Sequence, residues 1–102
     1  MSTIHHLKTL PTYFDAVERG EKTFEIRRDD RGFQKGDIVR LLRLPESGER
    51  VYALKNDPTY GLENIDRRIL WILTGGQFGL EPGYVILALG YLSDDEVAEA
   101  QS

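Results

Sequence analysis

A short stretch of the chain, residues 22–27, gathers side chains that can bind or react with a ligand. If this stretch is a strand, Thr23, Glu25 and Arg27 lie on one face at intervals of about 6.6 Å, with Lys22 where the strand begins. Such a row can recognise a nucleobase or a phosphate, or polarise a carbonyl group. The two cations favour the charged, accepting form of Glu25. The alternative is a solvent-exposed strand face with a cross-strand ion pair.

The charge balance around this strand favours anionic ligands. Residues 22–35 hold more basic than acidic side chains, and Arg31 and Lys35 are candidates for phosphate contacts. The whole chain has a formal net charge of −4, which argues against indiscriminate nucleic-acid binding. Residues 93–102 contain four carboxylates and no basic residue, so residues 1–92 are neutral overall. The alternative for residues 22–35 is a solvated loop of mixed charge.

A glycine-rich connection at residues 75–83 places Gln77 and Phe78 near its tip. Bare backbone can approach a ligand closely there, and an exposed ring can stack on a base. The alternative is that the glycines serve turn geometry and the ring packs in the core. The adjacent His5 and His6 point to opposite faces of an extended chain, and there is no cysteine, so we expect neither a metal site nor a cofactor.

The elements that must position these side chains are a helix followed by several short strands. Pro11 suits the first helical position and Gly20 the left-handed position after the last turn, which predicts a helix over residues 10–20. The apolar face of this helix is expected in the core: Leu10, Phe14 and Val17.

Alternating or continuous apolar residues predict strands at 22–27, 38–44, 50–54, 67–74 and 84–89. The strand side chains expected in the core are Phe24, Ile26, Trp71, Leu73, Val85 and Leu87. Residues 55–66 are expected to form a surface excursion, and a capping-box pattern at residues 93–96 predicts a short acidic helix. Short strands joined by Gly and Pro turns favour a closed or nearly closed small barrel, and an open α+β sheet is the competitor.

Four motifs in the chain carry a family resemblance. They are His6-x-Lys8, Gly20-Glu21-Lys22-Thr23-Phe24-Glu25-Ile26-Arg27, Asp30-Arg31-x-Phe33-x-x-Gly36-Asp37 and Gly75-Gly76-x-Phe78-Gly79-Leu80-x-x-Gly83-Tyr84. Together they resemble the ASCH branch of the PUA-like superfamily over residues 5–91. The resemblance implies an α+β fold in which residues 1–92 form a small PUA-like β-barrel with an N-terminal helix packed on it. Residues 93–102 are then an acidic tail or short helix.

The same resemblance implies binding of RNA or a modified nucleotide in a cleft on the strand that ends at Arg27. The ligand-binding candidates are Lys8, Lys22, Thr23, Glu25, Arg27, Arg31, Lys35, Gln77 and Phe78. Some small ASCH proteins deacylate acetylated cytidine, and a ribonuclease activity occurs elsewhere in the family. In the deacylating branch a lysine matching Lys22 works with a threonine where this chain has Glu25. The alternative function is therefore a hydrolase with Lys22 and Glu25 as catalytic residues, or a ribonuclease.

The chain shows no apolar run of membrane-span length and no apolar signal-peptide segment. With no cysteine, it is expected to be cytoplasmic. The expected partner is RNA or a nucleoside or nucleotide, and a monomer is expected.

Overall fold

The computed structural model describes residues 3–46 and 62–101, so the strand predicted at 50–54 lies outside the described residues. The elements in chain order are β1 (Ile4–Thr9), α1 (Pro11–Glu18), β2 (Phe24–Arg28), β3 (Ile38–Arg43), β4 (Asn64–Thr74), β5 (Tyr84–Gly90) and α2 (Asp94–Gln101).

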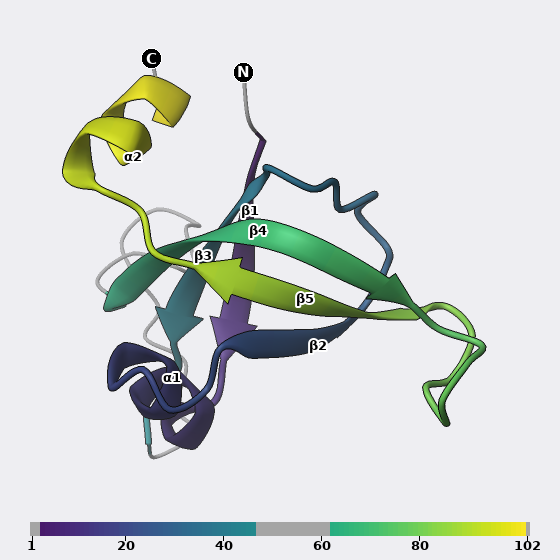
Figure 1. Ribbon diagram of the computed structural model, residues 1–102. Coiled ribbons are helices and arrows are strands. Elements are labelled where there is room, and N and C mark those ends of the chain that lie inside the picture. Colours follow the sequence, from purple (N-terminus) through teal and green to yellow (C-terminus); the bar gives the residue numbers. More distant parts are fainter. Residues whose placement is uncertain (1–2, 47–61, 102) are drawn as a thin grey trace.

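The strands form one curled sheet in the order β1-β3-β4-β5-β2 (Figure 1). β1 pairs with β3 in parallel, and the other three pairings are antiparallel. The curl brings the two edge strands, β1 and β2, close to each other, and α1 lies at one end of the half-barrel that results (Figure 1). The expected small α+β barrel-like fold is therefore present, with an opening between its two edges.

The helix follows its sequence signals. Pro11 is the first helical residue, and Gly20 adopts a φ of +82°, a conformation that glycine reaches without strain. Phe14 and Val17 are buried in the core, as predicted. Leu10 was expected beside them but is 55% exposed, because it precedes the helix in an extended conformation and does not share the helical face.

The first strand, β1, is missing from the sequence-based prediction. Its residues alternate between the core and solvent, with His5, Leu7 and Thr9 buried. A buried histidine needs a polar partner, and Asp37 lies 2.9 Å from its Nε2. The ring of Phe33 packs edge-on against the imidazole with 4.7 Å between ring centroids. Tertiary contacts therefore make a histidine behave as a core residue.

The face of β2 that points inward is the reverse of the prediction. Phe24 and Ile26 were expected in the core but are 41% and 51% exposed, whereas Glu25 is 3% exposed. Residues that face each other across an antiparallel ladder share one side of the sheet, and Glu25 is opposite the fully buried Leu87. The burial of the Glu25 carboxylate is tolerated because Lys22 and Arg27 form ion pairs with it.

A β-bulge in β4 overturns a second core prediction. The pairing with β5 shifts between Ile69 and Trp71, so these two residues point to opposite faces although they are two positions apart. Ile69 is buried, whereas Trp71 is 58% exposed. Leu73 follows Trp71 outward and is half-buried. The bulge has no strong signature in the sequence, so a regular strand was the natural expectation.

The elements from β4 to the C-terminal helix agree in most respects with the sequence-based prediction. β4 begins at Asn64, so the predicted surface excursion overlaps its first residues. The capping box before α2 is present: the backbone N–H of Glu96 donates to Ser93 Oγ at 3.2 Å, and that of Ser93 donates to Glu96 Oε1 at 3.3 Å. Val85 and Leu87 are buried as predicted. Within residues 3–46 and 62–101, neither helix has the length and apolar character needed to cross a bilayer.

Candidate functional site

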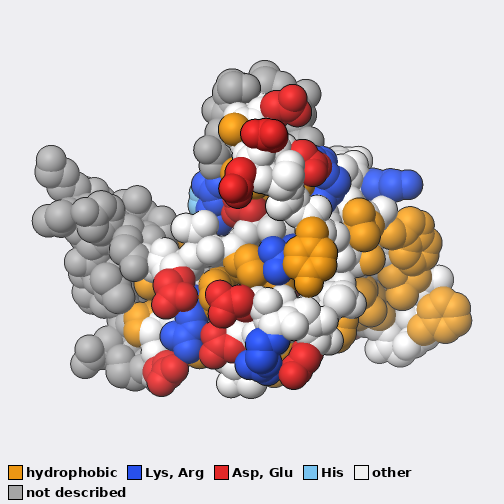
Figure 2. All heavy atoms as spheres, turned by 60° about the vertical axis from the view of Figure 1, so that its left-hand side comes forward, with side chains coloured by type: hydrophobic (Ala, Val, Ile, Leu, Met, Phe, Trp, Pro, Cys, Tyr) orange, Lys and Arg blue, Asp and Glu red, His pale blue; other side chains and the backbone are white. Residues whose placement is uncertain are grey.

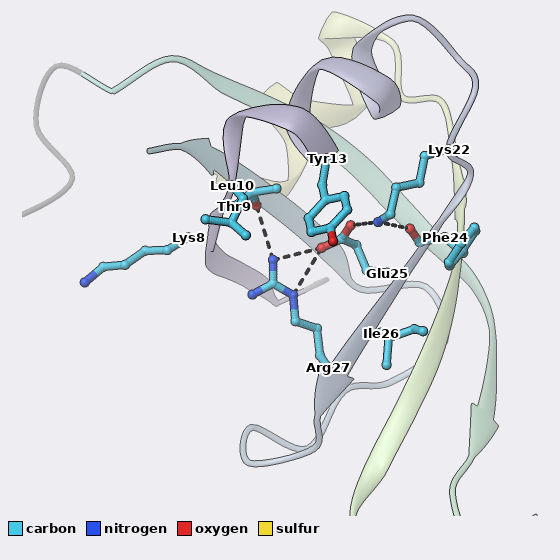
Figure 3. Close-up of a pocket in the computed structure, with 9 residues that line it drawn as sticks. All are labelled: Lys8, Thr9, Leu10, Tyr13, Lys22, Phe24, Glu25, Ile26 and Arg27. Atoms are coloured by element: carbon cyan, nitrogen blue, oxygen red, sulfur yellow. Dashed lines mark hydrogen bonds and ion pairs between the residues drawn. The ribbon is translucent and has the colours of Figure 1, made fainter. Parts of the chain in front are cut away.

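A pocket of about 440 Å³ opens where the two edge strands of the half-barrel approach each other (Figure 3). The end of β1, the first turn of α1 and the edge strand β2 contribute its walls. The residues that line it are Lys8, Thr9, Leu10, Tyr13, Lys22, Phe24, Glu25, Ile26 and Arg27.

The carboxylate of Glu25 is the centre of the pocket's polar groups. It points inward from β2, and its side chain is 4% exposed. Oε1 accepts hydrogen bonds from Nε and Nη2 of Arg27 at 3.1 and 2.8 Å. Oε2 accepts a hydrogen bond from Nζ of Lys22. Both oxygens are therefore engaged with cations, which offsets the desolvation of this buried charge.

Lys22 reaches the pocket from the turn that follows α1. Its Nζ also donates to the backbone carbonyl of Phe24 at 2.6 Å. The same ammonium lies 5.5 Å from the ring centroid of Tyr13 and 4.9 Å from that of Phe24, within cation–π range. Because two acceptors and two rings surround it, Lys22 is positioned as a fixed cation at the pocket wall.

Arg27 joins the two edges of the sheet. Its Nη2 donates to Thr9 Oγ1 on β1 at 3.2 Å, and Thr9 in turn donates to the carbonyl of Leu7 at 3.0 Å. The Arg27 side chain is 24% exposed. Among residues 3–46 and 62–101, no hydrogen-bond partner occurs for its Nη1. This nitrogen and the remaining N–H of Lys22 are two donors of the cluster that a ligand can use.

The structure brings together only part of the predicted site. Lys22, Glu25 and Arg27 form one cluster, and Lys8 contributes to the lining although its side chain points away from them (Figure 3). Thr23 is exposed and lines a separate small hollow beside Tyr91.

The remaining predicted residues lie outside the pocket. Arg31 donates to the carbonyl of His6, and Lys35 is exposed on the β2–β3 connection. Gln77 and Phe78 are at the β4–β5 turn, where Phe78 is 88% exposed and has a φ of +52°. Figure 1 shows this turn extending away from α1.

Five lining residues were not predicted to bind a ligand: Thr9, Leu10, Tyr13, Phe24 and Ile26. Thr9 closes the polar network on β1, and Tyr13 is 52% exposed at the pocket mouth. The signal for Thr9 in the sequence is its position two residues after the apolar Leu7, because an extended segment places both side chains on one face. The sequence predicts Leu10, Phe24 and Ile26 in the core, and only the position of β2 shows that these residues and Tyr13 border a pocket.

The pocket can bind a small polar ligand with an anionic group. Its lining has three cationic side chains and one carboxylate, and its volume is within the range of small-molecule sites. The rings of Tyr13 and Phe24 flank the Lys22 ammonium and offer surfaces for a planar group. Within the part of the chain that the structure describes, no group of three or more His, Asp or Glu side chains is placed to hold a metal ion.

Comparison with known proteins gives a family but no biochemical activity. The chain is 36% identical over 62 residues to the "Uncharacterized 12.9 kDa protein in GpA 3'region" of Escherichia phage P2, a match that covers 58% of this chain and 57% of the phage protein. A family model described as "Domain of unknown function (DUF3850)" matches residues 4–89. That match includes β1 to β4, β5 up to Leu89, α1 and every residue that lines the pocket. The chain therefore belongs to the DUF3850 family.

Proposed function

We propose that this protein binds RNA or a nucleotide, taking one nucleotide into the pocket between β1 and β2, and that the fold is an ASCH-type member of the PUA-like superfamily. The observation that carries the proposal is the buried Glu25, held between Lys22 and Arg27 on the floor of a pocket of about 440 Å³. A buried cluster of this kind needs a reason, because apolar residues would fill the same space without desolvating three charges.

The donors that remain unpaired within the described chain suit a nucleotide. Arg27 Nη1 and Lys22 Nζ can donate to a phosphate or to the carbonyl oxygen of a base. The rings of Tyr13 and Phe24 lie on either side of the ammonium, so a planar base can stack beside the group that holds its polar edge. Glu25 keeps both cations in place before the ligand arrives, which reduces the entropy lost on binding.

Binding is better supported than the alternative, hydrolysis. A general base must have a lone pair that can take a proton from water or a nucleophile. Three hydrogen bonds from cations occupy three of the about four lone-pair positions of the Glu25 carboxylate, and Lys22 donates to two acceptors. Thr9 is the hydroxyl within the cluster, and it donates to the Leu7 carbonyl while accepting from Arg27. The cluster is thus arranged to hold charge and not to transfer protons.

The test is a screen of nucleosides, nucleotides and short RNAs by thermal shift, followed by titration calorimetry of the hits. We expect a nucleotide to raise the melting temperature, and we expect Arg27→Ala and Lys22→Met to weaken binding at least about tenfold, as loss of a charge-assisted contact does. For a single-stranded ligand, the logarithm of the binding constant should fall with the logarithm of the salt concentration, with a slope of about −0.7 per phosphate contact.

The matched control is Arg19→Ala, which removes an exposed arginine at the C-terminal end of α1, outside the pocket. It should leave affinity unchanged. If no nucleotide or RNA binds at low salt, or if Arg27→Ala binds as well as the wild type, the proposal is wrong. Turnover of acetylated cytidine or RNA that both Lys22→Met and Glu25→Gln abolish would support the hydrolase instead.

A further inference from the structure

The outer face of the sheet, opposite the core, has an uncovered apolar surface. Residues paired across the ladders form two rows on this face: Phe24, Ala88 and Trp71 in the first, and Ile26, Ile86 and Leu73 in the second. None of the six is buried, and Trp71 is 58% exposed. In Figure 2 hydrophobic side chains gather at the right-hand side of the molecule, whereas acidic and basic side chains are interspersed on the side that faces the viewer.

The rings of Phe24 and Trp71 are exposed to solvent at separate places on this surface. Phe24 and Trp71 are on strands that flank β5, so their backbones are two strand spacings apart, roughly 9.6 Å. Between them the central strand offers only the methyl group of Ala88. At this separation the rings do not stack on each other, so each presents a face for a different planar group.

The charged side chains around this surface carry both signs, with cations at two of its borders. Along its two rows and the adjoining pair of Arg28 and Tyr84, arginine is the one charged side chain. Its guanidinium lies 5.3 Å from the centroid of the Tyr84 ring and donates to the hydroxyl of that residue. At the opposite border the ammonium of Lys22 lies 4.9 Å from the Phe24 ring. Lys22 is paired with Glu25, and Glu81 and Asp30 act on Arg28 through their charge, so these border cations are partly neutralised. The exposed aromatic rings between them offer surfaces on which bases can stack.

The surface is continuous with the pocket. Phe24 and Ile26 belong to its two rows and also line the pocket, because β2 is an edge strand with the pocket along its free side. A polymer whose terminal or flipped base enters the pocket can therefore continue across the edge strand β2. Its next nucleotides meet the outer face at Phe24 and then approach Trp71.

We infer that the outer face of β2, β5 and β4 is a stacking platform for single-stranded RNA, which binds the nucleotides adjacent to the one in the pocket. This inference rests on the proposed function, since the pocket defines where the strand begins. Trp71 provides the outer stacking position, and Arg28 neutralises a phosphate at the end of the platform.

The test uses Trp71 itself, because it is the single tryptophan of the chain and its fluorescence reports on this surface alone. The full-length protein is titrated with nucleoside monophosphates and with oligoadenylates and oligouridylates of up to about eight residues, within the site sizes of single-strand binders. We expect the oligonucleotides to quench Trp71, and we expect the monophosphates to bind without quenching. The corresponding DNA oligomers show whether the platform is selective for RNA.

Affinity is measured in parallel with labelled oligonucleotides. Trp71→Ala should weaken oligonucleotide binding about fivefold or more, the factor expected for loss of one stacked base, and Trp71→Phe should restore most of it. Monophosphate affinity should not change in either variant. Tyr91→Ala is the matched control, because Tyr91 is 76% exposed but stacks on Arg67 beside a different hollow. Circular dichroism and melting curves establish that the variants fold.

The outcomes separate the platform from the pocket. If monophosphates bind but Trp71→Ala leaves oligonucleotide affinity unchanged, the platform is wrong and the pocket stands. If oligonucleotides quench Trp71 while monophosphates do not bind and Arg27→Ala has no effect, the pocket is wrong and the platform stands. Concentration-dependent dimerisation that Trp71→Ala abolishes would overturn the platform, because it would assign this face to a second copy of the chain.

Discussion

The replacement Glu25→Gln tests whether the buried carboxylate holds the pocket together. Glutamine preserves the shape of the side chain but supplies one acceptor oxygen and one NH2 group in place of two acceptor oxygens. In the native cluster one oxygen faces Arg27 and the other faces Lys22. Whichever way the amide turns, its NH2 group faces the N–H groups of either Arg27 or Lys22. Two donors then face each other without an acceptor, in a site that is almost closed to water.

The magnitude follows from the burial of the three side chains. Glu25 is 4% exposed, whereas Lys22 and Arg27 are 17% and 24% exposed and can turn partly toward solvent. Removing one member of a fully buried pair destabilises by roughly 3–5 kcal/mol, and an unpaired buried donor by roughly 1–3 kcal/mol. We therefore expect Glu25→Gln to lower the free energy of unfolding by about 2–3 kcal/mol. In a domain of this size that corresponds to a fall in Tm of roughly 10–20 °C.

The assay is thermal and urea-induced unfolding followed by circular dichroism, with a control of identical chemistry. Glu21→Gln removes the carboxylate of an ion pair with Arg19 whose two side chains are 67% and 56% exposed. Exposed pairs contribute little because water and salt screen them, so this variant should melt like the wild type. If Glu25→Gln and Glu21→Gln lower Tm equally, the reasoning from burial is refuted. In a double-mutant cycle, Lys22→Met and Glu25→Gln should couple by more than about 1 kcal/mol.

Three further predictions concern the core and the C-terminal helix. Phe14→Ala should destabilise by about 3–5 kcal/mol in urea titrations, because it opens a cavity where a fully buried ring anchors α1 to the sheet; a loss below about 1 kcal/mol would contradict this packing. Truncation after Leu92 should leave Tm and nucleotide affinity nearly unchanged, because the ion pair that joins the sheet to α2, between Arg68 and Glu96, is formed by partly exposed groups and contributes little. The backbone N–H of Ser93, and then the side chains of Arg68 and Ser93, lower the pKa of Glu96. Because the folded-state pKa is the lower one, these bonds stabilise the helix above the unfolded-state pKa and are lost as the pH falls through the folded-state value. An NMR titration should therefore show α2 signals changing with Glu96 only in acid, and a midpoint at or above that of exposed glutamates would contradict the prediction.

Local signals in the sequence were sufficient for several elements. Pro11 and Gly20 mark the ends of the first helix because their backbone preferences act within a few residues. The capping box from Ser93 to Glu96 is equally local. Strands with buried apolar residues, such as β5 with Val85 and Leu87, follow from an apolar run of strand length. The close spacing of Lys22, Glu25 and Arg27 also indicated a cluster, because residues two apart on a strand share a face.

Only the tertiary structure decided which face of β2 is buried. An isolated strand with Phe24 and Ile26 on one side and charges on the other has an obvious apolar face, and that face is the exposed one. Pairing with β5 sets the direction, since Glu25 lies opposite Leu87 on the core side. The cluster then becomes a buried network instead of a solvated one, and the rings become an outer surface.

The pocket itself depends on contacts between residues far apart in the chain. Thr9 and Arg27 belong to the two edges of the sheet, and they meet only because five strands curl through a half-barrel. The strand that carries Thr9 was not predicted, because a histidine such as His5 is not among the residue types most often fully buried. Its burial here depends on the hydrogen bond with Asp37, which is distant in the sequence. The sequence by itself therefore determined the helices, most strands and the cluster of Lys22, Glu25 and Arg27. The register of the pairing, the bulge at β4 and the approach of the sheet's edges were decided by long-range packing, because the free energy of burial depends on neighbours that no local pattern specifies.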